Sequence, residues 1–333
     1  MRARRLLEKV DATPEYLADV EKLLERTLAN PERSVFVGGP LQQAARHLTL
    51  GAGGKRIRPL LAFLFARAVG VRGVDVVTIG TSAELVHSAS LLHDDVVDAG
   101  MFRRSRPTVN AQWGNITAVM AGDMLLVSAI RLLESLDRRI TQEAVRTVDE
   151  MTRATMAEVE ARNDLDVPID RFRAICEGKT GSLFAYCGSA AAILGDDKDA
   201  QSRFSAFARH LGVAFQFADD VLDLTGQDAK KPQYADLRSR TPSLPVLIAA
   251  KDASLRRSIR DLWGFGSMSD ERVREVGEAI LASGAVGTAA KKVNAEIALA
   301  QDALRPLSSR VGVDELLSWA TQLADSVETG GSR

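Results

Sequence analysis

The 333-residue chain has little of several features that mark common protein classes. It contains only two cysteines, Cys176 and Cys187, and four histidines, and no Cys/His spacing typical of a zinc site. The two cysteines are eleven residues apart and lie close to one helical face if that stretch is helical. The GxSxG, P-loop and GxGxxG signatures are also missing from a strand–helix context. We therefore expect two buried thiols in a reducing compartment.

The sequence also shows no charge excess, and we expect neither a secretory leader nor an apolar run as long as a membrane span. Its 43 basic and 44 acidic residues leave a net charge of −1, which favours neither nucleic acid nor an anionic membrane as partner. The N-terminal sequence MRARRLLEKVDATPEYL has no apolar core of a signal peptide. The most apolar stretch, Leu60 to Phe65, is far shorter than the roughly 20 residues of a membrane span. These features predict a cytoplasmic protein without a transmembrane segment and without a nucleic-acid partner.

Helical periodicity, by contrast, is present along most of the chain, and strand signals are scarce. The stretch from Val76 to Val97 is apolar on most of its circumference, as expected for a helix in the middle of a bundle. We therefore predict a single all-α domain over 1–333 whose central helices surround a deep cavity, with core motifs in 40–250 and C-terminal helices in 254–326. The predicted helices cover 13–29, 40–52, 57–70, 74–98, 111–136, 141–163, 169–194, 199–225, 242–251, 254–263, 270–283, 287–304 and 312–326.

Two clusters of aspartates are the main candidates for metal-binding residues. In the first, Asp94 and Asp98 are four residues apart and share one helical face, while Asp95 is rotated by about 100°. Carboxylates this close need a cation between them or a raised pKa, and Mg²⁺ shared with substrate phosphates fits. One such cluster by itself is also consistent with an acidic helix end on the surface. A second copy with the same spacing, Asp219 to Asp223, follows another apolar helical run and favours two metal-binding sets.

Basic residues supply the opposite charge. Lys55 and Arg58 begin a helix after a glycine pair, and helix N-termini attract phosphate. Arg103 and Arg104 follow the first cluster, and arginine forks suit diphosphate oxygens. Each basic pair alone is typical of a solvated surface, and His87 alone is typical of a buried core histidine. Together with two acidic clusters, they indicate a site for two polyphosphate anions.

These residues resemble the trans-prenyl diphosphate synthase family, whose members are farnesyl, geranylgeranyl and longer polyprenyl diphosphate synthases. The resemblance rests on GGKRIRP (53–59), ELVHSASLLHDDVVD (84–98), RRSRPTVNAQWGN (103–115), GD (122–123), KTGSLF (179–184) and FQFADDVLDLTG (215–226). It implies a helical bundle, usually a homodimer, that joins isopentenyl diphosphate to an allylic prenyl diphosphate. A class I terpene cyclase and a non-catalytic subunit of a heteromeric synthase are the alternatives, but both aspartate clusters and GGKRIRP are intact here.

Position by position, the resemblance implies the following roles. Asp94 and Asp98 bind two Mg²⁺ ions, and Asp219 binds a third, with Asp223 near it or bound through water. The allylic diphosphate is bound by Arg103, Lys179 and Lys231, and isopentenyl diphosphate by Lys55, Arg58, His87 and Arg104. Thr180 and Gln216 lie at the reaction centre. The chain departs from the family pattern at Ser105, where a glycine is usual. The family's second lysine falls on Thr241, so that phosphate contact is lost unless Arg240 replaces it.

Two small residues, Ala89 and Ser90, lie one helical turn before Asp94. In this family bulky aromatics at these positions block the growing tail and give a short product. The resemblance therefore implies a long product of about C30–C50, because cavity depth sets product length. A farnesyl or geranylgeranyl product stays open, because a large residue deeper in the cavity, such as Val86 or one near Met124, would also cap the chain.

Overall fold

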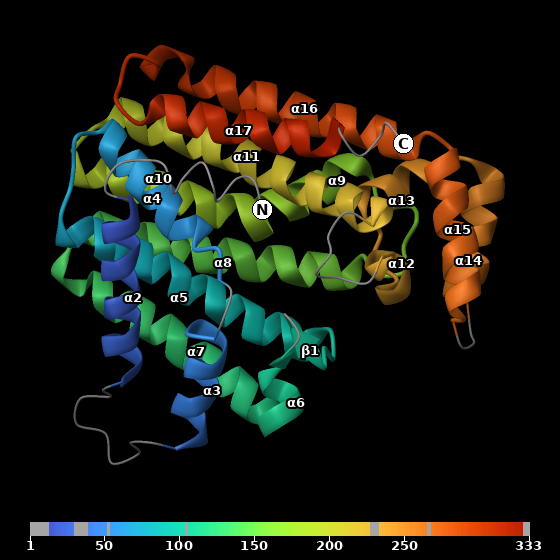
Figure 1. Cartoon of the computed structure of the whole chain (residues 1–333), viewed down its shortest axis with the longest axis horizontal. Coiled ribbons are helices and arrows are strands. Elements are labelled where there is room, and N and C mark those ends of the chain that lie inside the picture. The colour runs from blue at the N-terminus through green and yellow to red at the C-terminus, as the bar shows by residue number, and fades with distance from the viewer. Residues whose placement is uncertain are drawn as a thin grey trace. The chain divides into compact units, whose positions relative to one another are not determined.

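The computed structural model describes residues 13–29, 39–51, 54–103, 106–226, 233–264 and 268–328, and these are almost entirely helical (Figure 1). The N-terminal helices are α2 (Thr13–Ala29), α3 (Pro40–Thr49), α4 (Ile57–Ala68), α5 (Val74–Val97), α6 (Val109–Trp113), α7 (Asn115–Leu132) and η1 (Leu133–Ser135). A two-residue hairpin of β1 (Phe102–Arg103) and antiparallel β2 (Arg106–Pro107) pairs Phe102 with Pro107 and Arg103 with Arg106.

The second half of the chain continues in the same all-helical manner. The helices are α8 (Arg138–Glu160), α9 (Ile169–Cys176), η2 (Glu177–Gly181), α10 (Ser182–Leu194), α11 (Lys198–Thr225), α12 (Ala235–Ser239), α13 (Leu244–Ala249), α14 (Ala253–Trp263), α15 (Asp270–Ala282), α16 (Ala285–Leu304), η3 (Arg305–Leu307) and α17 (Val313–Glu328). The chain divides into two compact units. Unit 1 comprises Met1–Val148, Leu183–Ser205 and Pro306–Leu316, and unit 2 comprises Asp149–Ser182, Ala206–Arg305 and Leu317–Arg333. The single domain and its deep cavity stay predictions.

Helix α5 forms the centre of unit 1. Its residues from Thr78 to Val86 are all buried, as the all-round apolar pattern predicts, and it packs against α2, α4 and α7. The Tyr16 hydroxyl of α2 approaches so closely that a Cβ on Gly80 would lie 2.1 Å from it, so only glycine fits there. The first half of α5, which leads to the first aspartate cluster, is therefore closely packed.

In unit 2, the C-terminal part of α11 is held by aromatic packing and by short capped helices. The rings of Phe172 on α9 and Phe217 on α11 stack with centroids 5.9 Å apart, within the range of favourable aromatic pairs. Trp263 Nε1 donates to the Leu237 carbonyl at 3.0 Å and so ties α12 to α14. These contacts fix the region that carries the second aspartate cluster.

The structure differs from the sequence prediction at several places. The helix predicted over 111–136 is divided by Gly114, whose φ of 84° favours glycine, and α6 and α7 lie on either side. The helix predicted over 169–194 is interrupted by η2, a turn of π-helix. A third difference is the apolar segment Asn115–Ser135, which has a mean hydropathy of 1.8 and is long and apolar enough to cross a membrane. Only 33% of its most apolar 18-residue stretch is buried. The expectation that no segment approaches this length was wrong.

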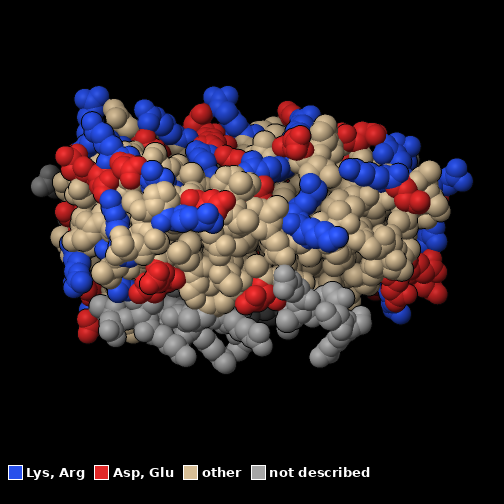
Figure 2. Space-filling model, turned by 90° about the horizontal axis from the view of Figure 1, so that it is seen from above, with Lys and Arg blue, Asp and Glu red and all other residues tan. Residues whose placement is uncertain are grey.

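On the face shown in Figure 2, the Lys and Arg side chains are intermixed with Asp and Glu side chains. This distribution matches the nearly balanced composition of the sequence.

Candidate functional site

The first aspartate cluster lies at the C-terminal end of α5 in unit 1. Asp94 is half-buried and Asp98, the residue that ends the helix, is exposed. Asp95 is buried, and the guanidinium of Arg103 donates to its carboxylate through Nε at 3.0 Å and Nη2 at 2.8 Å. The three carboxylates are therefore not equivalent, since Asp95 holds an arginine while Asp94 and Asp98 lie on the more accessible side.

The hairpin that follows α5 positions Arg103, which the sequence assigns to the allylic diphosphate. Arg103 lies on β1, and its side chain keeps an exposed fraction of 30% while it grips Asp95. Such a bidentate arginine–carboxylate pair fixes the plane of the guanidinium. Arg104 and Ser105 lie outside the described residues.

The residues predicted to bind isopentenyl diphosphate also belong to unit 1. Lys55 is exposed just before α4, and Arg58 in the first turn of α4 is half-buried with its Cζ 5.5 Å from the centroid of the Phe184 ring. His87 is half-buried on α5, two turns before Asp94. The structure thus places these three residues in the unit that also carries Asp94.

Sequence reasoning missed Arg56, the first of the two arginines of GGKRIRP. Arg56 adopts a left-handed backbone with φ of 48° and inserts its guanidinium between two carboxylates. Its Nε lies 2.6 Å from Glu21 Oε1, and its Nη1 lies 2.6 Å from Glu84 Oε1. Burial lowers the pKa of Arg56, but the two carboxylates outweigh it and raise that pKa above its ordinary value. Arg56 therefore anchors the segment that presents Lys55 and Arg58.

The second aspartate cluster lies near the end of α11 in unit 2, and its members also differ. Asp219 is half-buried, whereas Asp220 and Asp223 are buried. Asp223 accepts hydrogen bonds from the backbone N–H groups of Ala235 at 3.0 Å and Asp236 at 3.2 Å, at the start of α12. Its role as a metal ligand, direct or through water, stays a prediction.

Asp220 makes a similar contact with the next helix. Its Oδ2 accepts the backbone N–H of Leu244 at 3.0 Å, at the start of α13, and its Oδ1 accepts from Gln216 Nε2 at 3.3 Å. Burial raises the pKa of Asp220 well above its ordinary value, and the nearby charge of Asp236 adds to this. Gln216, predicted at the reaction centre, is thus oriented by Asp220.

The π-helical turn η2 in unit 2 carries Lys179 and Thr180. Thr180 is buried, and Lys179 is half-buried with its Nζ paired to the carboxylate of Glu158 on α8. Lys231, predicted to bind the same diphosphate, lies outside the described residues. Arg240 is half-buried in a left-handed conformation with φ of 58°, and its replacement of the family lysine stays a hypothesis.

The carboxylates fit Mg²⁺ bound together with a phosphate. Mg²⁺ typically takes one or two protein carboxylates and completes its shell with water and substrate phosphates. Across the ranges that the structure describes, no three His, Cys, Asp or Glu side chains form a group that could hold an ion by themselves. Asp94 and Asp98 in unit 1, and Asp219 in unit 2, are hard oxygen donors that suit Mg²⁺ bound together with phosphate.

The family membership follows from a comparison with known proteins. Residues 40–280 match the family model described as Polyprenyl synthetase. The chain belongs to this family. The polyprenyl synthetase match covers both aspartate clusters and the GGKRIRP segment, as the sequence resemblance predicts.

Relatives with different products are similar to the chain. It is 36% identical over 268 residues to an octaprenyl diphosphate synthase of Haemophilus influenzae, covering 76% of this chain and 78% of that protein. It is 37% identical over 243 residues to a (2E,6E)-farnesyl diphosphate synthase of Mycobacterium bovis, covering 69% and 68%. A polyprenyl synthase structure from Caulobacter crescentus, complexed with calcium and isoprenyl diphosphate, superposes with a TM-score of 0.86 at 26% identity and covers 97% of each chain.

These similarities confirm the all-α isoprenoid synthase fold and the enzyme class. The chain is a trans-prenyl diphosphate synthase, a prenyltransferase of isoprenoid biosynthesis. The family implies isopentenyl diphosphate and an allylic diphosphate as substrates and uses divalent metal ions. Elongation is therefore favoured over cyclisation and over a non-catalytic role.

The residues predicted to set product length lie on α5 in unit 1. Ala89 is fully buried. Ser90 is half-buried, and its hydroxyl donates to the His87 carbonyl at 2.8 Å. Both side chains are small, and no large side chain occupies either position.

Proposed function

We propose that this synthase makes a long all-trans polyprenyl diphosphate of about C30–C50, because the residues five and four positions before Asp94 on α5 have small side chains. The observation that carries this proposal is the pair Ala89 and Ser90. A residue four or five positions before Asp94 lies one helical turn closer to the N-terminus of α5, where an aromatic ring would occupy space that the growing tail needs. The octaprenyl relative supports a long product and the farnesyl relative a short one.

The proposed reaction begins with ionisation of the allylic diphosphate. Asp94 and Asp98 would hold two Mg²⁺ ions and Asp219 a third, and these ions would supply positive charge to stabilise the departing diphosphate. Lys179, Arg103 and Lys231 bind the same diphosphate with fixed positive charge, which favours cleavage of the allylic C–O bond.

The second substrate binds to the cationic residues of unit 1. Lys55, Arg58, His87 and Arg104 hold the diphosphate of isopentenyl diphosphate, whose double bond attacks the allylic cation. Thr180 and Gln216 orient oxygen dipoles toward the cation. The new C–C bond forms, and the proton that is lost passes to the released diphosphate. An apolar cavity excludes water, which would otherwise quench the cation.

We further propose that the enzyme is a cytoplasmic homodimer that uses α7 as its contact surface. Ile116, Met120 and Val127 on α7 have exposed fractions of 82%, 47% and 58%. Their spacing of four and seven residues places them on one face of the helix. Apolar stripes of this kind mark interaction surfaces on soluble proteins, and a second copy would cover this one.

Product analysis tests the proposed function. Purified enzyme is incubated with Mg²⁺, labelled isopentenyl diphosphate and allylic primers of increasing length, and products are separated by thin-layer chromatography and mass spectrometry. Wild-type enzyme is expected to elongate the primer to about C30 or longer, and a chelator is expected to abolish turnover. A farnesyl product from wild-type enzyme, or full turnover with the chelator, would overturn the proposal.

Ala89→Phe tests directly whether the small side chains before Asp94 permit a long product. The phenyl ring fills the turn before Asp94, so the product is expected to shorten by several isoprene units while turnover persists. Ala89→Ser is the matched control, because it keeps a small side chain and should keep the wild-type product. An unchanged product distribution for Ala89→Phe would show that another residue sets the length.

A further inference from the structure

The π-helical turn η2, Glu177–Gly181, raises the question of what keeps it in place. The sequence predicts an uninterrupted helix across this region, and the structure has an extra residue in the turn that carries Lys179 and Thr180. Isolated π turns are rare and are stabilised by their surroundings. If this turn relaxed to an ordinary α-helix, the residues beyond the lost insertion would rotate by about 100°. The direction of Lys179 and Thr180 relative to the flanking helices therefore depends on the turn.

Glycines allow the neighbouring helices to touch the backbone of this turn. A Cβ on Gly178 would lie 2.7 Å from the Ala154 Cβ of α8, and a Cβ on Gly181 would lie 2.9 Å from the carbonyl oxygen of Arg209 on α11. A Cβ on Gly212 would lie 2.4 Å from the Gly181 Cα. Helix α11 thus meets the backbone of η2 directly, and α8 meets it through the Ala154 methyl group.

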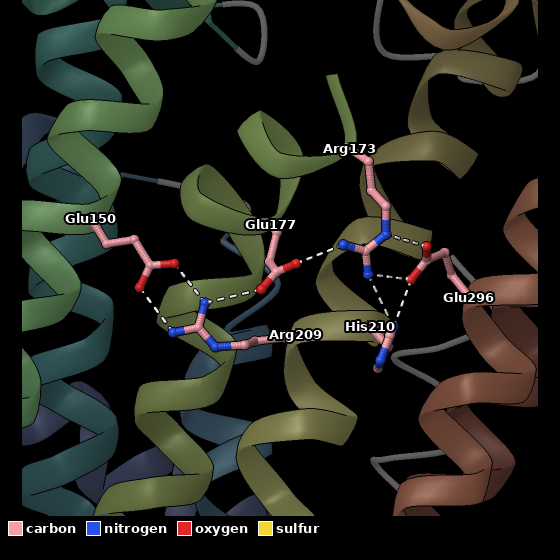
Figure 3. A network of polar contacts seen from close by, with 6 residues as sticks. All are labelled: Glu150, Arg173, Glu177, Arg209, His210 and Glu296. Atoms are coloured by element: carbon pink, nitrogen blue, oxygen red, sulfur yellow. Dashed lines mark hydrogen bonds and ion pairs between the residues drawn. The ribbon is translucent and has the colours of Figure 1, made fainter. Parts of the chain in front are cut away.

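An ionic network joins Glu177, the first residue of the turn, to helices α9 and α11 (Figure 3). The Glu177 carboxylate accepts from Arg173 Nη1 at 2.7 Å and from Arg209 Nη1 at 3.3 Å. Arg209 in turn donates to both oxygens of Glu150 on α8, at 2.5 and 2.9 Å. Glu177 is therefore held from two sides, and Arg209 links it across to α8.

The network continues away from Glu177 to helix α16. Arg173 donates to the two Glu296 oxygens at 2.5 and 3.0 Å, and His210 Nδ1 lies 2.7 Å from Glu296 Oε2. Both arginines thus approach Glu177 from positions fixed by a second carboxylate. Because each arginine has its own partner, the orientation of each guanidinium is set before it reaches Glu177.

We propose that Glu177 and Arg209 are positioning residues that hold the π-helical turn in the register that presents Lys179 and Thr180 to the allylic diphosphate. This inference rests on the proposed function, which assigns the allylic diphosphate to Lys179. Neither residue is assigned to the reacting atoms, since Glu177 is the first residue of the turn and Arg209 contacts its carboxylate from α11. Their loss is expected to impair the chemistry of the allylic substrate selectively and to spare isopentenyl diphosphate, whose residues Lys55, Arg58 and His87 belong to unit 1.

Steady-state kinetics of Glu177→Gln and Arg209→Gln test this role. Each variant is expected to lower kcat by about tenfold or more and to raise the KM for the allylic primer, with the KM for isopentenyl diphosphate unchanged within about twofold. Both substitutions break the same Glu177–Arg209 contact. The double variant should therefore lose little more activity than the less active of the two single variants. Arg209→Lys keeps the charge with fewer donors and should recover part of kcat.

Arg153→Gln is the matched control, because Arg153 lies on α8 and its side chain, 79% exposed, pairs with Asp149 at 3.0 Å. It should leave kcat and both KM values at wild-type levels. A merely structural role for Glu177 and Arg209 would instead lower Tm and reduce kcat/KM equally for both substrates. That result, or wild-type kinetics in both variants, would overturn the proposal.

Hydrogen exchange tests the turn without relying on turnover. In Glu177→Gln, peptides that cover 177–181 should exchange amide hydrogen faster than in wild type, whereas peptides of α5 should not change. Unchanged exchange in 177–181 would refute the positioning role. If the wild-type enzyme fails to elongate any primer, the proposed function fails, and this measurement still decides whether Glu177 holds the turn.

Discussion

At the scale of single residues, identical side chains within one motif have different tasks. Asp94 and Asp98 lie half-buried and exposed at the end of α5, whereas buried Asp95 grips Arg103. In the second cluster, Asp220 receives the N–H of Leu244 rather than lying toward solvent. The middle aspartate of each motif therefore serves the protein framework, a division that the repeated spacing does not reveal.

Asp95→Asn tests this division of roles. The amide removes the charge that orients Arg103, and a hydrogen bond to a charged group contributes about 1.5–3 kcal/mol. We expect the KM for the allylic primer to rise by roughly tenfold to a hundredfold, with an unchanged Mg²⁺ concentration for half-maximal activity. The measurement is a Mg²⁺ titration at fixed substrate, with Asp94→Asn as the comparison that should require more Mg²⁺. A raised Mg²⁺ requirement in Asp95→Asn would make Asp95 a metal ligand.

At the scale of helices, the long elements could be predicted, whereas several of the short ones could not. The periodicity over 13–29 predicts α2 at its observed bounds, and that over 270–283 ends one residue beyond α15. Helix α12 and the β1–β2 hairpin were missed because five and two residues per element are too few to show a period. Their positions depend on distant partners, such as Asp223, which accepts the N–H of Ala235 twelve residues later.

In the candidate site, too, features set by local spacing could be predicted from the sequence, whereas contacts between distant residues could not. The four-residue spacing of Asp94 and Asp98 predicts a shared helical face, because spacing is a local property. The partners of Arg56, by contrast, are Glu21 and Glu84, 35 and 28 residues away. Glu177, the first residue of the π turn that contains Lys179, likewise pairs with Arg209, 32 residues beyond it. No periodicity encodes such pairings.

The link between α9, α11 and α16 predicts an acid-sensitive contact. Burial would raise the pKa of Glu296, but hydrogen bonds from His210 and Arg173 outweigh it and lower that pKa below its ordinary value. A carboxylate with a depressed pKa in the folded state stabilises the fold above its unfolded pKa, and this contribution is lost as the pH falls through the folded pKa.

We therefore expect Glu296→Gln to lower stability by about 1–3 kcal/mol near neutral pH and by less in acid. Thermal melts at a series of pH values between neutrality and the onset of acid unfolding measure this difference. Asp302→Asn, which alters an exposed pair between Asp302 of α16 and Arg305 of η3, is the control that should leave Tm unchanged. A constant difference between wild type and Glu296→Gln at all pH values would contradict the expectation.

At the scale of the whole molecule, the proposed dimer predicts the effect of a charge on α7. Ile116→Glu places a carboxylate in a face that a second copy would bury, and the variant should be monomeric when measured by light scattering after size exclusion. Val311→Glu is the control, because Val311 is 65% exposed elsewhere in unit 1. A wild-type enzyme that is monomeric, or an Ile116→Glu variant that stays dimeric, would rule out this surface as the interface.

The contact between Gly181 and Gly212 has a consequence for protein engineering. Replacing glycine by alanine inside helices is a common route to thermostable catalysts, and at Gly287 of α16, where nothing lies within 4 Å of the added methyl, it should add about 0.4–1 kcal/mol. The same exchange at Gly212 would force two backbones apart, since the methyl would lie 2.4 Å from the Gly181 Cα. A consensus or library approach that treats all helical glycines alike would gain heat resistance at one position and disable the catalyst at the other.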